Sequence, residues 1–362
     1  MNRMKMLLGF WLRLVCFVLL VGVTLCYTVY VLTPKHDYGI CPIINLYHQE
    51  EDTVDVLVLG TSCGYAGVNT NILFEEYGIA AYNLCGAEQP YWVTYFYLEE
   101  ALKTQHPKLI LLDAKASIYQ DDYSKRGRTI LSTYGIRSLD TRMRAIAACV
   151  ADEDFAGFAL AFPELHSYYA KVEAKNFVYP PDNGGRGPNW KGYIEMDVTE
   201  QHQKPSLVWT DIKKPINARQ QEYFEKTLAL AQAHEIPVML VGFPNPDYAN
   251  DHMYYNSLWH VAEQYGVGGV NYNDPTLRVR LLYSSDFADW QHLNVKGSIK
   301  FSRQLAEDLK ERYDLPDRRG EKGYESWDEC ARLWYEKYPT FESAHAEENP
   351  LHWFDDPEPA DV

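Results

Sequence analysis

The chain has 362 residues, enough for one large domain with insertions or for two smaller domains. It carries 50 acidic against 34 basic residues, which gives a formal net charge of −16 at pH 7. That balance argues against a nucleic-acid partner, because nucleic-acid binding normally needs a basic stripe. The seven cysteines form no C-x-x-C pair, so neither a zinc knuckle nor a redox dithiol is indicated.

The amino-terminal segment predicts a membrane anchor. Leu14–Leu32 is an uncharged run of 19 residues, close to the ~20 that a helix needs to cross a bilayer. Arg3, Lys5 and Arg13 precede it, and basic residues favour the cytoplasmic side of a membrane. We therefore expect residues 1–32 to hold a cytoplasmic amino terminus and a transmembrane signal anchor, with all that follows extracytoplasmic. A cleaved signal peptide is the alternative, but its apolar core normally spans only ~7–15 residues before an A-x-A site.

Alternating strands and helices follow a juxtamembrane linker predicted over residues 33–52. In Val54–Leu59 five of six residues are Val or Leu, a pattern typical of a parallel strand buried on both faces. The sequence then predicts a helix that starts at Asn69 or Thr70 and ends before Gly78, a strand over 80–84, a helix over 91–104 and a strand over 109–113. Aromatic residues recur at helical spacing in the second helix, which favours packing on a sheet over a role as a sugar platform.

The alternation breaks between residues 114 and 215, where we expect a long insertion over the active face that acts as a lid or a partner-docking surface. A helix is predicted there near 141–150, and residues 179–188 are rich in turn-forming types. Beyond the insertion the sequence predicts a helix over 217–234, a strand over 237–242, a helix over 251–265, a strand over 270–272 and a closing helix over 295–313.

Five strands joined by crossover helices predict one α/β domain over residues 53–313, a flavodoxin-like doubly wound parallel sheet. The acidic tail, residues 314–362, has a predicted short helix near 327–338 and no assigned function. Ligands of such sheets bind beyond the carboxyl ends of the strands. Ser62 stands directly after the first strand, so we expect it at that edge.

A serine hydroxyl is a poor nucleophile until a base takes its proton and a third group orients the base. His292 is the candidate base and Asp289, three residues earlier, the candidate orienting acid. Other interpretations remain open. The Gly-Thr-Ser turn alone is a common βα connection, and Asn294 can simply cap the last helix. Asp286, Asp289 and His292 can be read as metal ligands, although no second His or Cys cluster accompanies them. His166 is interpreted as a hydrogen-bonded structural histidine rather than a second base.

The pairing of Gly60-Thr61-Ser62 after a buried strand with Asp289-x-x-His292-Leu293-Asn294 before the last helix resembles the SGNH/GDSL hydrolase superfamily. More closely, the chain looks like the membrane-anchored bacterial branch that handles acyl groups on cell-surface polymers. That branch includes the lipoteichoic acid D-alanyl transfer proteins and the alginate O-acetylation proteins. Residues 77–84 and 162–167 also look like this branch, and the resemblance spans about residues 54–313.

The resemblance implies a catalytic triad and an oxyanion hole. Ser62 matches the nucleophile, His292 the general base and Asp289 its orienting acid. The family's oxyanion hole uses the N–H of the nucleophile itself, here Ser62, and a glycine N–H after the second strand, here Gly86.

The third oxyanion donor of the family is an Asn side chain after the third strand. Here that strand ends in Asp113-Ala114-Lys115, so the position holds an acceptor in place of a donor, and Gln89 is the expected substitute. Losing one such donor typically costs ~100–1000-fold in rate.

The resemblance implies a serine esterase or O-acyltransferase that forms an acyl-Ser62 intermediate and requires no metal or organic cofactor. Its expected substrate is an acetyl or D-alanyl group on a cell-envelope polysaccharide or teichoic-acid-like polymer, and its expected partner is a membrane acyl-donor protein. The alternative is a non-catalytic envelope scaffold that keeps the fold and binds glycan or a membrane acyltransferase.

Overall fold

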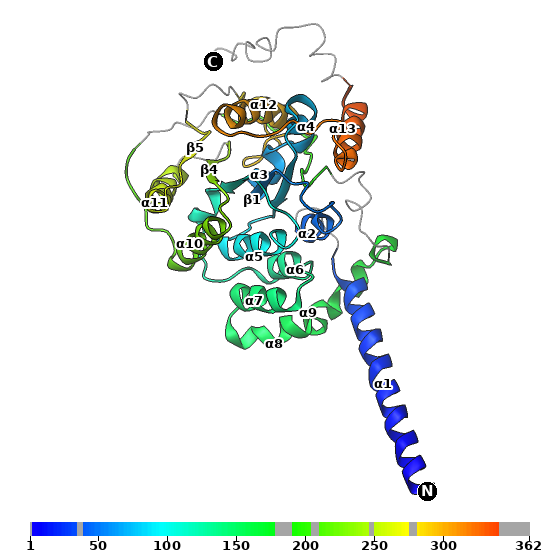
Figure 1. Ribbon diagram of the computed structural model, residues 1–362. Helices are drawn as coiled ribbons and strands as arrows, with labels where there is room; N and C mark the ends of the chain where they lie inside the picture. Colours follow the sequence, from blue (N-terminus) through cyan, green and yellow to red (C-terminus); the bar gives the residue numbers. More distant parts are fainter. Residues whose placement is uncertain are drawn as a thin grey trace.

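The computed structural model describes residues 2–34, 39–177, 190–203, 210–245, 250–274 and 281–339. Its centre is a five-stranded sheet in which every strand pair is parallel and the strand order is β2-β1-β3-β4-β5 (Figure 1). This order is the one that defines a flavodoxin-like sheet, so the predicted sheet is confirmed. The strands are β1 Val56–Gly60, β2 Ala81–Cys85, β3 Leu109–Asp113, β4 Val238–Gly242 and β5 Gly269–Asn271.

The predicted crossover helices are present with small shifts at their ends. They are α4 Thr70–Tyr77, α5 Tyr91–Ala101, α10 Ala218–Ala233, α11 Asp251–Gln264 and α12 Val295–Arg312. The start and end of α4 show why the sequence predicts its bounds. The Asn69 side chain accepts a hydrogen bond from the Asn71 N–H at its start, and Gly78 adopts a left-handed φ of 71° at its end.

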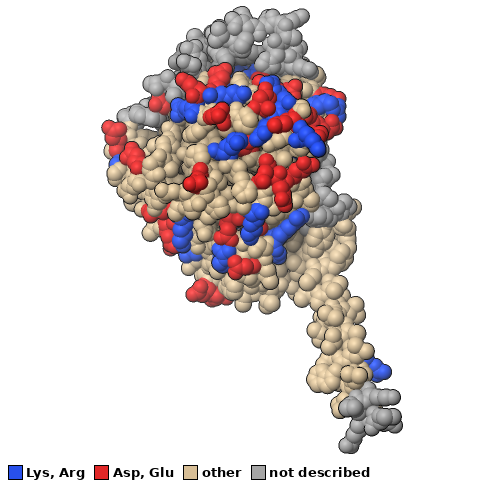
Figure 2. Space-filling view, in the orientation of Figure 1, with Lys and Arg blue, Asp and Glu red and all other residues tan. Residues whose placement is uncertain are grey.

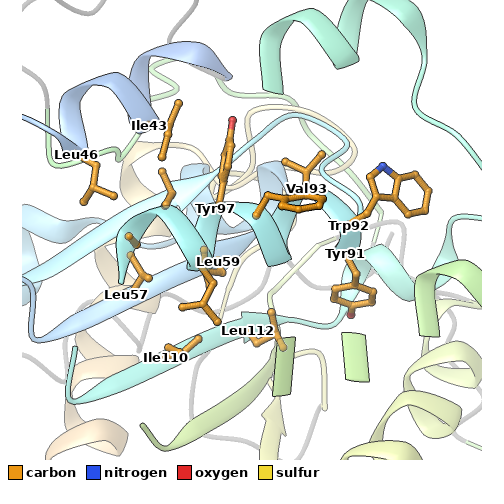
Figure 3. Close-up of a cluster of buried hydrophobic side chains, with 14 of the residues drawn as sticks. Ile43, Leu46, Leu57, Leu59, Tyr91, Trp92, Val93, Tyr97, Ile110 and Leu112 are labelled. Carbon is orange, nitrogen blue, oxygen red and sulfur yellow. The ribbon is translucent and has the colours of Figure 1, made fainter. Parts of the chain in front are cut away.

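The two faces of the sheet carry separate apolar cores. Side chains that alternate along the strands pack on one face against α2 (Ile40–Leu46), α5 and α10. The other set packs against α3 (Ser62–Gly67) and α12. Because both faces are covered, the strands read as continuous apolar runs, and each fully buried Val or Leu contributes about 1.5–3 kcal/mol. Figure 3 shows part of the first core, with Ile43, Leu46, Leu57, Leu59, Tyr91, Trp92, Val93, Tyr97, Ile110 and Leu112 labelled.

The aromatic residues of α5 belong to this core. The Trp92 and Phe96 side chains are 1% and 4% exposed, and the Tyr91 ring lies 5.1 Å from the ring of Phe224 on α10. The interpretation of this stripe as a packing surface is therefore confirmed.

Two segments that the sequence assigns to a linker and a tail are packed parts of the domain. In α2, Ile43 and Leu46 are fully buried. In α13 (Glu325–Lys337), the Trp327 and Trp334 side chains are buried and the helix packs against α4. An ion pair between Arg318 and Asp55, 2.8 Å apart, ties the intervening chain to the entrance of β1.

Residues 114–215 form no strand in their described parts. They contain η1 Lys115–Ile118, α6 Arg126–Thr133, α7 Leu139–Cys149, α8 Asp152–Leu160, α9 Phe162–Leu165, η2 His166–Lys171 and η3 Ala174–Phe177. The helix predicted near 141–150 is α7, which packs on α5, whereas the turn-rich residues 179–188 lie outside the described residues. Residues 190–203 run beside the candidate site, where the Ile194 N–H donates to the Tyr65 carbonyl at 2.9 Å. A role of this segment as a lid stays a prediction.

Helix α1 (Asn2–Leu32) extends away from the domain (Figure 1). Within it, Met6–Leu32 is long and apolar enough to cross a membrane. Its last turn is different from the rest, because Val31 and Leu32 are buried against the domain.

Candidate active site

Strand β1 ends in a turn that only glycine permits. Gly60 has a φ of +149°, and a Cβ at this position would lie 2.1 Å from the Cβ of Asp113. Thr61 then caps α3, with its side chain accepting a hydrogen bond from the Cys63 N–H. Ser62 is the first residue of α3 and is 8% exposed. The structure therefore places Ser62 at the carboxyl edge of the sheet, as predicted.

Asp113 anchors this turn from the neighbouring strand. Its carboxylate accepts hydrogen bonds from the Thr61 N–H at 2.9 Å and the Thr61 hydroxyl at 2.5 Å. It also accepts the Lys115 N–H at 2.9 Å. Burial raises the pKa of Asp113, and these hydrogen bonds oppose that rise. Asp113 thus holds the residue before Ser62 in place and donates nothing toward a substrate.

Asp289 and His292, the candidate orienting acid and base, lie in direct contact. The His292 Nδ1 lies 2.8 and 2.9 Å from the two carboxylate oxygens of Asp289. The same carboxylate accepts the backbone N–H groups of Gln291 and His292 at 2.7 and 2.9 Å. Burial pushes the pKa of Asp289 upward, but these hydrogen bonds outweigh it and leave the pKa below its usual value. An ionised Asp289 assigns the proton of neutral His292 to Nδ1, which leaves Nε2 as an acceptor.

The two loops meet around Tyr65. The Tyr65 ring stacks on the His292 ring, with centroids 6.1 Å apart and planes 11° apart. Burial raises the pKa of the Tyr65 phenol, and the charge of Arg128 and the nearby Ser62 side chain partly oppose the rise. The Cys63 thiol also lies 3.7 Å from the Gln291 carbonyl oxygen. Ser62 and His292 are therefore neighbours across one small surface.

The structure does not join Ser62 to His292 by a hydrogen bond. The Nε2 atom of His292 is buried and has no hydrogen-bond partner among the residues that the structure describes. Hydrogen bonds between catalytic groups are often long or poorly aligned before substrate binds. The arrangement thus presents a base with an open acceptor beside a candidate nucleophile.

Two of the predicted oxyanion donors are occupied. The Gly86 N–H donates to the Gly60 carbonyl at 3.0 Å, and the Gln89 Nε2 donates to the Thr94 hydroxyl at 3.0 Å. In this conformation the Gly86 N–H is engaged, and so is one of the two N–H groups of the Gln89 amide. The Ser62 N–H makes no hydrogen bond to any residue that the structure describes, so it remains available.

Cys63, next to Ser62, is not a competing nucleophile. Its side chain is buried, and burial raises the pKa of the thiol to about 12. The thiolate is the reactive form of cysteine, so this thiol is inert near neutral pH. Behind it, the Lys115 ammonium and the Asp251 carboxylate form an ion pair, with side chains 4% and 13% exposed.

The alternative interpretations of the His292 loop fare differently. Asp286 is fully buried and pairs with Lys300 at 2.9 Å, so it does not join Asp289 and His292 as a ligand. Within the described ranges, no three His, Cys, Asp or Glu side chains gather in a way that can hold a metal ion. Asn294 does cap α12, accepting the Gly297 N–H at 3.0 Å, and this capping coexists with the Asp289–His292 pair.

His166, which the sequence analysis considered as a second base or a structural histidine, is the first residue of η2. Its Nδ1 lies 2.7 Å from the Pro163 carbonyl oxygen. The hydrogen bond expected of a structural histidine is therefore present.

Sequence reasoning missed three residues around the site. Tyr65 stands one helical turn after Ser62, and that spacing is the signal that places it beside the nucleophile. The positive charge of Arg128 on α6 opposes the rise that burial causes in the pKa of Tyr65. Arg128 also pairs with Glu88 at 3.3 Å. Trp290, between the acid and the base, is 55% exposed.

Comparison with protein-family models and with curated proteins found no match for this chain. The structure itself defines an α/β protein with a five-stranded parallel sheet and an amino-terminal apolar helix. Its candidate active site stands at the carboxyl edge of that sheet.

Proposed function

We propose that the chain is an extracytoplasmic serine esterase or O-acyltransferase that works through an acyl-Ser62 intermediate. One observation carries the proposal. The His292 Nδ1 is held by Asp289 while its Nε2 is buried with no hydrogen-bond partner among the described residues, and the ring stacks on Tyr65, which lies three residues after Ser62 on α3. A base with this tautomer beside a serine is the arrangement that activates a hydroxyl nucleophile.

The proposed reaction has two halves. The Ser62 Oγ attacks the carbonyl carbon of an ester while its proton moves to the His292 Nε2. The bond from that carbon to the leaving oxygen then breaks, and His292 returns the proton to the leaving alcohol. In the second half, water or a glycan hydroxyl gives its proton to His292 and attacks the acyl carbon. The bond from that carbon to the Ser62 Oγ then breaks, and His292 returns the proton to Ser62. Every proton and electron pair is supplied by the substrates and this triad, so no cofactor is required.

The oxyanion site sets the expected speed. The Ser62 N–H is available, whereas Gly86 and Gln89 are engaged. Each missing donor typically costs ~100–1000-fold in rate. We therefore expect slow turnover on simple esters, faster only where the natural substrate supplies its own stabilising group.

The substrate class rests on the resemblance and on the amino-terminal helix. Basic residues before the apolar run favour an extracytoplasmic position for the domain. We propose an acetyl or D-alanyl group on a cell-envelope polysaccharide or teichoic-acid-like polymer as substrate, with a membrane protein as the acyl donor. The exposed Trp290, adjacent in sequence to Asp289, offers a flat apolar surface on which a sugar ring can rest.

The first test is labelling of the full chain in detergent with a fluorophosphonate probe, which reacts with activated serines. We expect labelling of the wild type, loss of labelling in Ser62→Ala and full labelling in Ser167→Ala. Ser167 is an exposed serine of η2 and serves as the matched control. An unlabelled wild type, under conditions that label a related serine hydrolase, overturns the catalytic proposal.

A non-catalytic envelope scaffold is the second candidate, and the engagement of Gly86 and Gln89 favours it. The two functions separate in a cell that depends on this protein for polymer acylation. The scaffold keeps its effect in Ser62→Ala, whereas the enzyme loses it. For an enzyme, following the labelled acyl group into water or onto a glycan hydroxyl distinguishes the hydrolase from the transferase.

A further inference from the structure

Exposed apolar side chains outside α1 gather in one short segment. Among the described residues beyond that helix, nine large hydrophobic side chains are exposed, and four of them fall within residues 160–177. They are Leu160, Phe162, Tyr169 and Phe177, with exposed fractions of 68%, 41%, 74% and 55%. Single exposed apolar residues are normal on soluble proteins, but a local cluster marks an interaction surface.

This segment, which we call the collar, comprises the end of α8, α9, η2 and η3, and it lies against the domain end of α1. Helices α9, η2 and η3 all contact α1, and Figure 1 shows them beside the point where α1 leaves the domain. The Asn176 side chain donates to the Val31 carbonyl at 3.0 Å, which ties η3 to the last turn of α1. The collar therefore has a fixed height along the helix.

The exposed length of α1 sets where a membrane surface falls. Residues 6–27 are exposed apart from the partly covered Gly9, and residues 28–34 are partly or fully covered by the domain. Residues 6–27 extend about 33 Å at ~1.5 Å per residue, close to the ~30 Å hydrocarbon core of a bilayer. Arg13, the charged residue in this stretch, lies toward its amino-terminal end, where a long basic side chain can reach the cytoplasmic interface. In Figure 2 this stretch shows a single basic patch, near its amino-terminal end. A bilayer that covers the exposed stretch thus ends at the level of the collar.

The chemistry of the collar suits the boundary between lipid and water. One of its carboxylates, Glu164, turns toward the domain, where it pairs with Arg126 at 2.6 Å. The Lys171 ammonium lies over the Tyr168 ring, 5.4 Å from its centroid. Aromatic and basic residues are the types enriched at this boundary.

We propose that the collar inserts its exposed apolar side chains into the outer interfacial layer of the membrane that α1 spans. This inference rests on the membrane anchoring in the proposed function and goes beyond it. Insertion gives the domain a second attachment beside the helix. Two attachments restrict rotation about α1 and hold the carboxyl edge of the sheet in a defined orientation to the membrane, which a helix alone does not do.

The test measures lipid contact in the full chain reconstituted in nanodiscs. Cys16→Ala and Cys26→Ala remove the two exposed cysteines, and the other five are buried. An environment-sensitive dye is then attached at Leu160→Cys or Tyr169→Cys, with Val198→Cys as the matched control. Val198 is 60% exposed and lies near the start of α12, away from α1. Lipids that carry a nitroxide near the top of the acyl chain quench a dye that reaches them.

We expect a blue-shifted emission and loss of intensity at positions 160 and 169, with neither change at position 198. A dye on native Cys26, in a chain that keeps this cysteine, reports insertion of α1 itself. Quenching of a dye at Cys26 without quenching at positions 160 and 169 overturns the proposal that the collar inserts into the membrane. So does a dye at both positions that is hidden from a water-soluble quencher yet untouched by the lipid nitroxide, because a protein partner or a second copy then covers the segment.

Failure of the anchor is distinguishable from failure of the chemistry. No quenching at Cys26 removes the premise and the collar together, whereas fluorophosphonate labelling of Ser62 does not depend on the membrane. Two collar positions are used because both are exposed, so neither substitution disturbs a packed core.

Discussion

The two halves of the candidate active site are built in opposite ways. The Ser62 turn is held by contacts between distant parts of the chain, since Thr61 and its buried partner Asp113 are 52 residues apart. Asp289 and His292 are three residues apart, and their side chains are 36% and 14% exposed. The sheet therefore sets the position of Ser62, the proposed nucleophile, while a surface loop sets the position of His292, the proposed base. The distance between Ser62 and His292 therefore depends on the conformation of the loop that carries His292.

This difference explains why the base is oriented but unengaged. Asp289 accepts hydrogen bonds from both the ring and the backbone of His292, which fixes the orientation of the ring, and the His292 Nε2 has no partner among the described residues. We expect a substrate that covers the loop to bring Nε2 onto the Ser62 hydroxyl. Substitutions of Ser62 or His292 should therefore lower activity, whereas substitutions in the Gly60 turn should lower stability.

The largest effect is expected from removing either reacting group. Ser62→Ala and His292→Ala should each lower kcat by on the order of 10⁴-fold or more, and to similar extents, because a nucleophile and its base act as a unit. The measurement is turnover of an activated acetyl ester by each single variant and by the double variant. A double variant no worse than either single variant is expected. Retained turnover in His292→Ala places the base elsewhere.

The next effect tests the rigid half alone. Gly60→Ala places a Cβ 2.1 Å from the Asp113 Cβ at a φ of +149°, so we expect a loss of stability of about 3 kcal/mol or more. Gly127→Ala is the matched control, because a Cβ there meets nothing within 4 Å and alanine is favoured within α6. Thermal unfolding of both variants in detergent is the measurement. Equal unfolding midpoints for Gly60→Ala and Gly127→Ala contradict the close packing of the Gly60 turn against Asp113.

Local signals explain what was predictable in this molecule. The Val and Leu runs of β1 and β3 reveal parallel strands because both faces of the sheet are covered. The Asp289–His292 pair is visible because its members are close in sequence. Membership of a hydrolase family stays an expectation.

The features that the sequence did not predict are contacts between residues that lie far apart in the chain. Asp113 was expected to weaken an oxyanion hole. Its hydrogen bonds to Thr61, which we call the clamp, form only because β1 and β3 lie side by side. The burial of Trp327 and Trp334 likewise depends on the position of α4. Gly86 was assigned as a donor without knowledge that the Gly60 carbonyl already takes its N–H.

A smaller effect should follow from loosening the clamp without a clash. Asp113→Asn keeps the shape but weakens the acceptor for the Thr61 groups, and we expect kcat to fall about 10- to 100-fold, which corresponds to ~1–3 kcal/mol. Asp113 acts here as a positioning residue. The effect should shrink in a Thr61→Val background, because the hydroxyl partner is already gone. A loss of the same size in both backgrounds shows that Asp113 acts through something other than this clamp.

The smallest effect concerns the Asp289–His292 pair and its pH dependence. Hydrogen bonds from His292 and Gln291 outweigh burial and lower the pKa of Asp289 below its usual value. A carboxyl with a lowered folded-state pKa stabilises the protein above its unfolded value, and that contribution disappears as pH falls through the folded value. The side chain is 36% exposed, so solvent screening limits the contribution to about 0–1 kcal/mol.

The wild type should therefore exceed Asp289→Asn in stability at neutral pH by a margin that stays constant down to about pH 5 and shrinks below about pH 4. Chemical denaturation of both proteins between pH 7 and pH 3 measures the margin. Asp121→Asn, at an exposed carboxylate, is the matched control and should show no such margin. A margin that grows on acidification contradicts an ionised Asp289. Because an ionised Asp289 fixes the His292 tautomer, that outcome would also remove the reason for treating His292 Nε2 as the base.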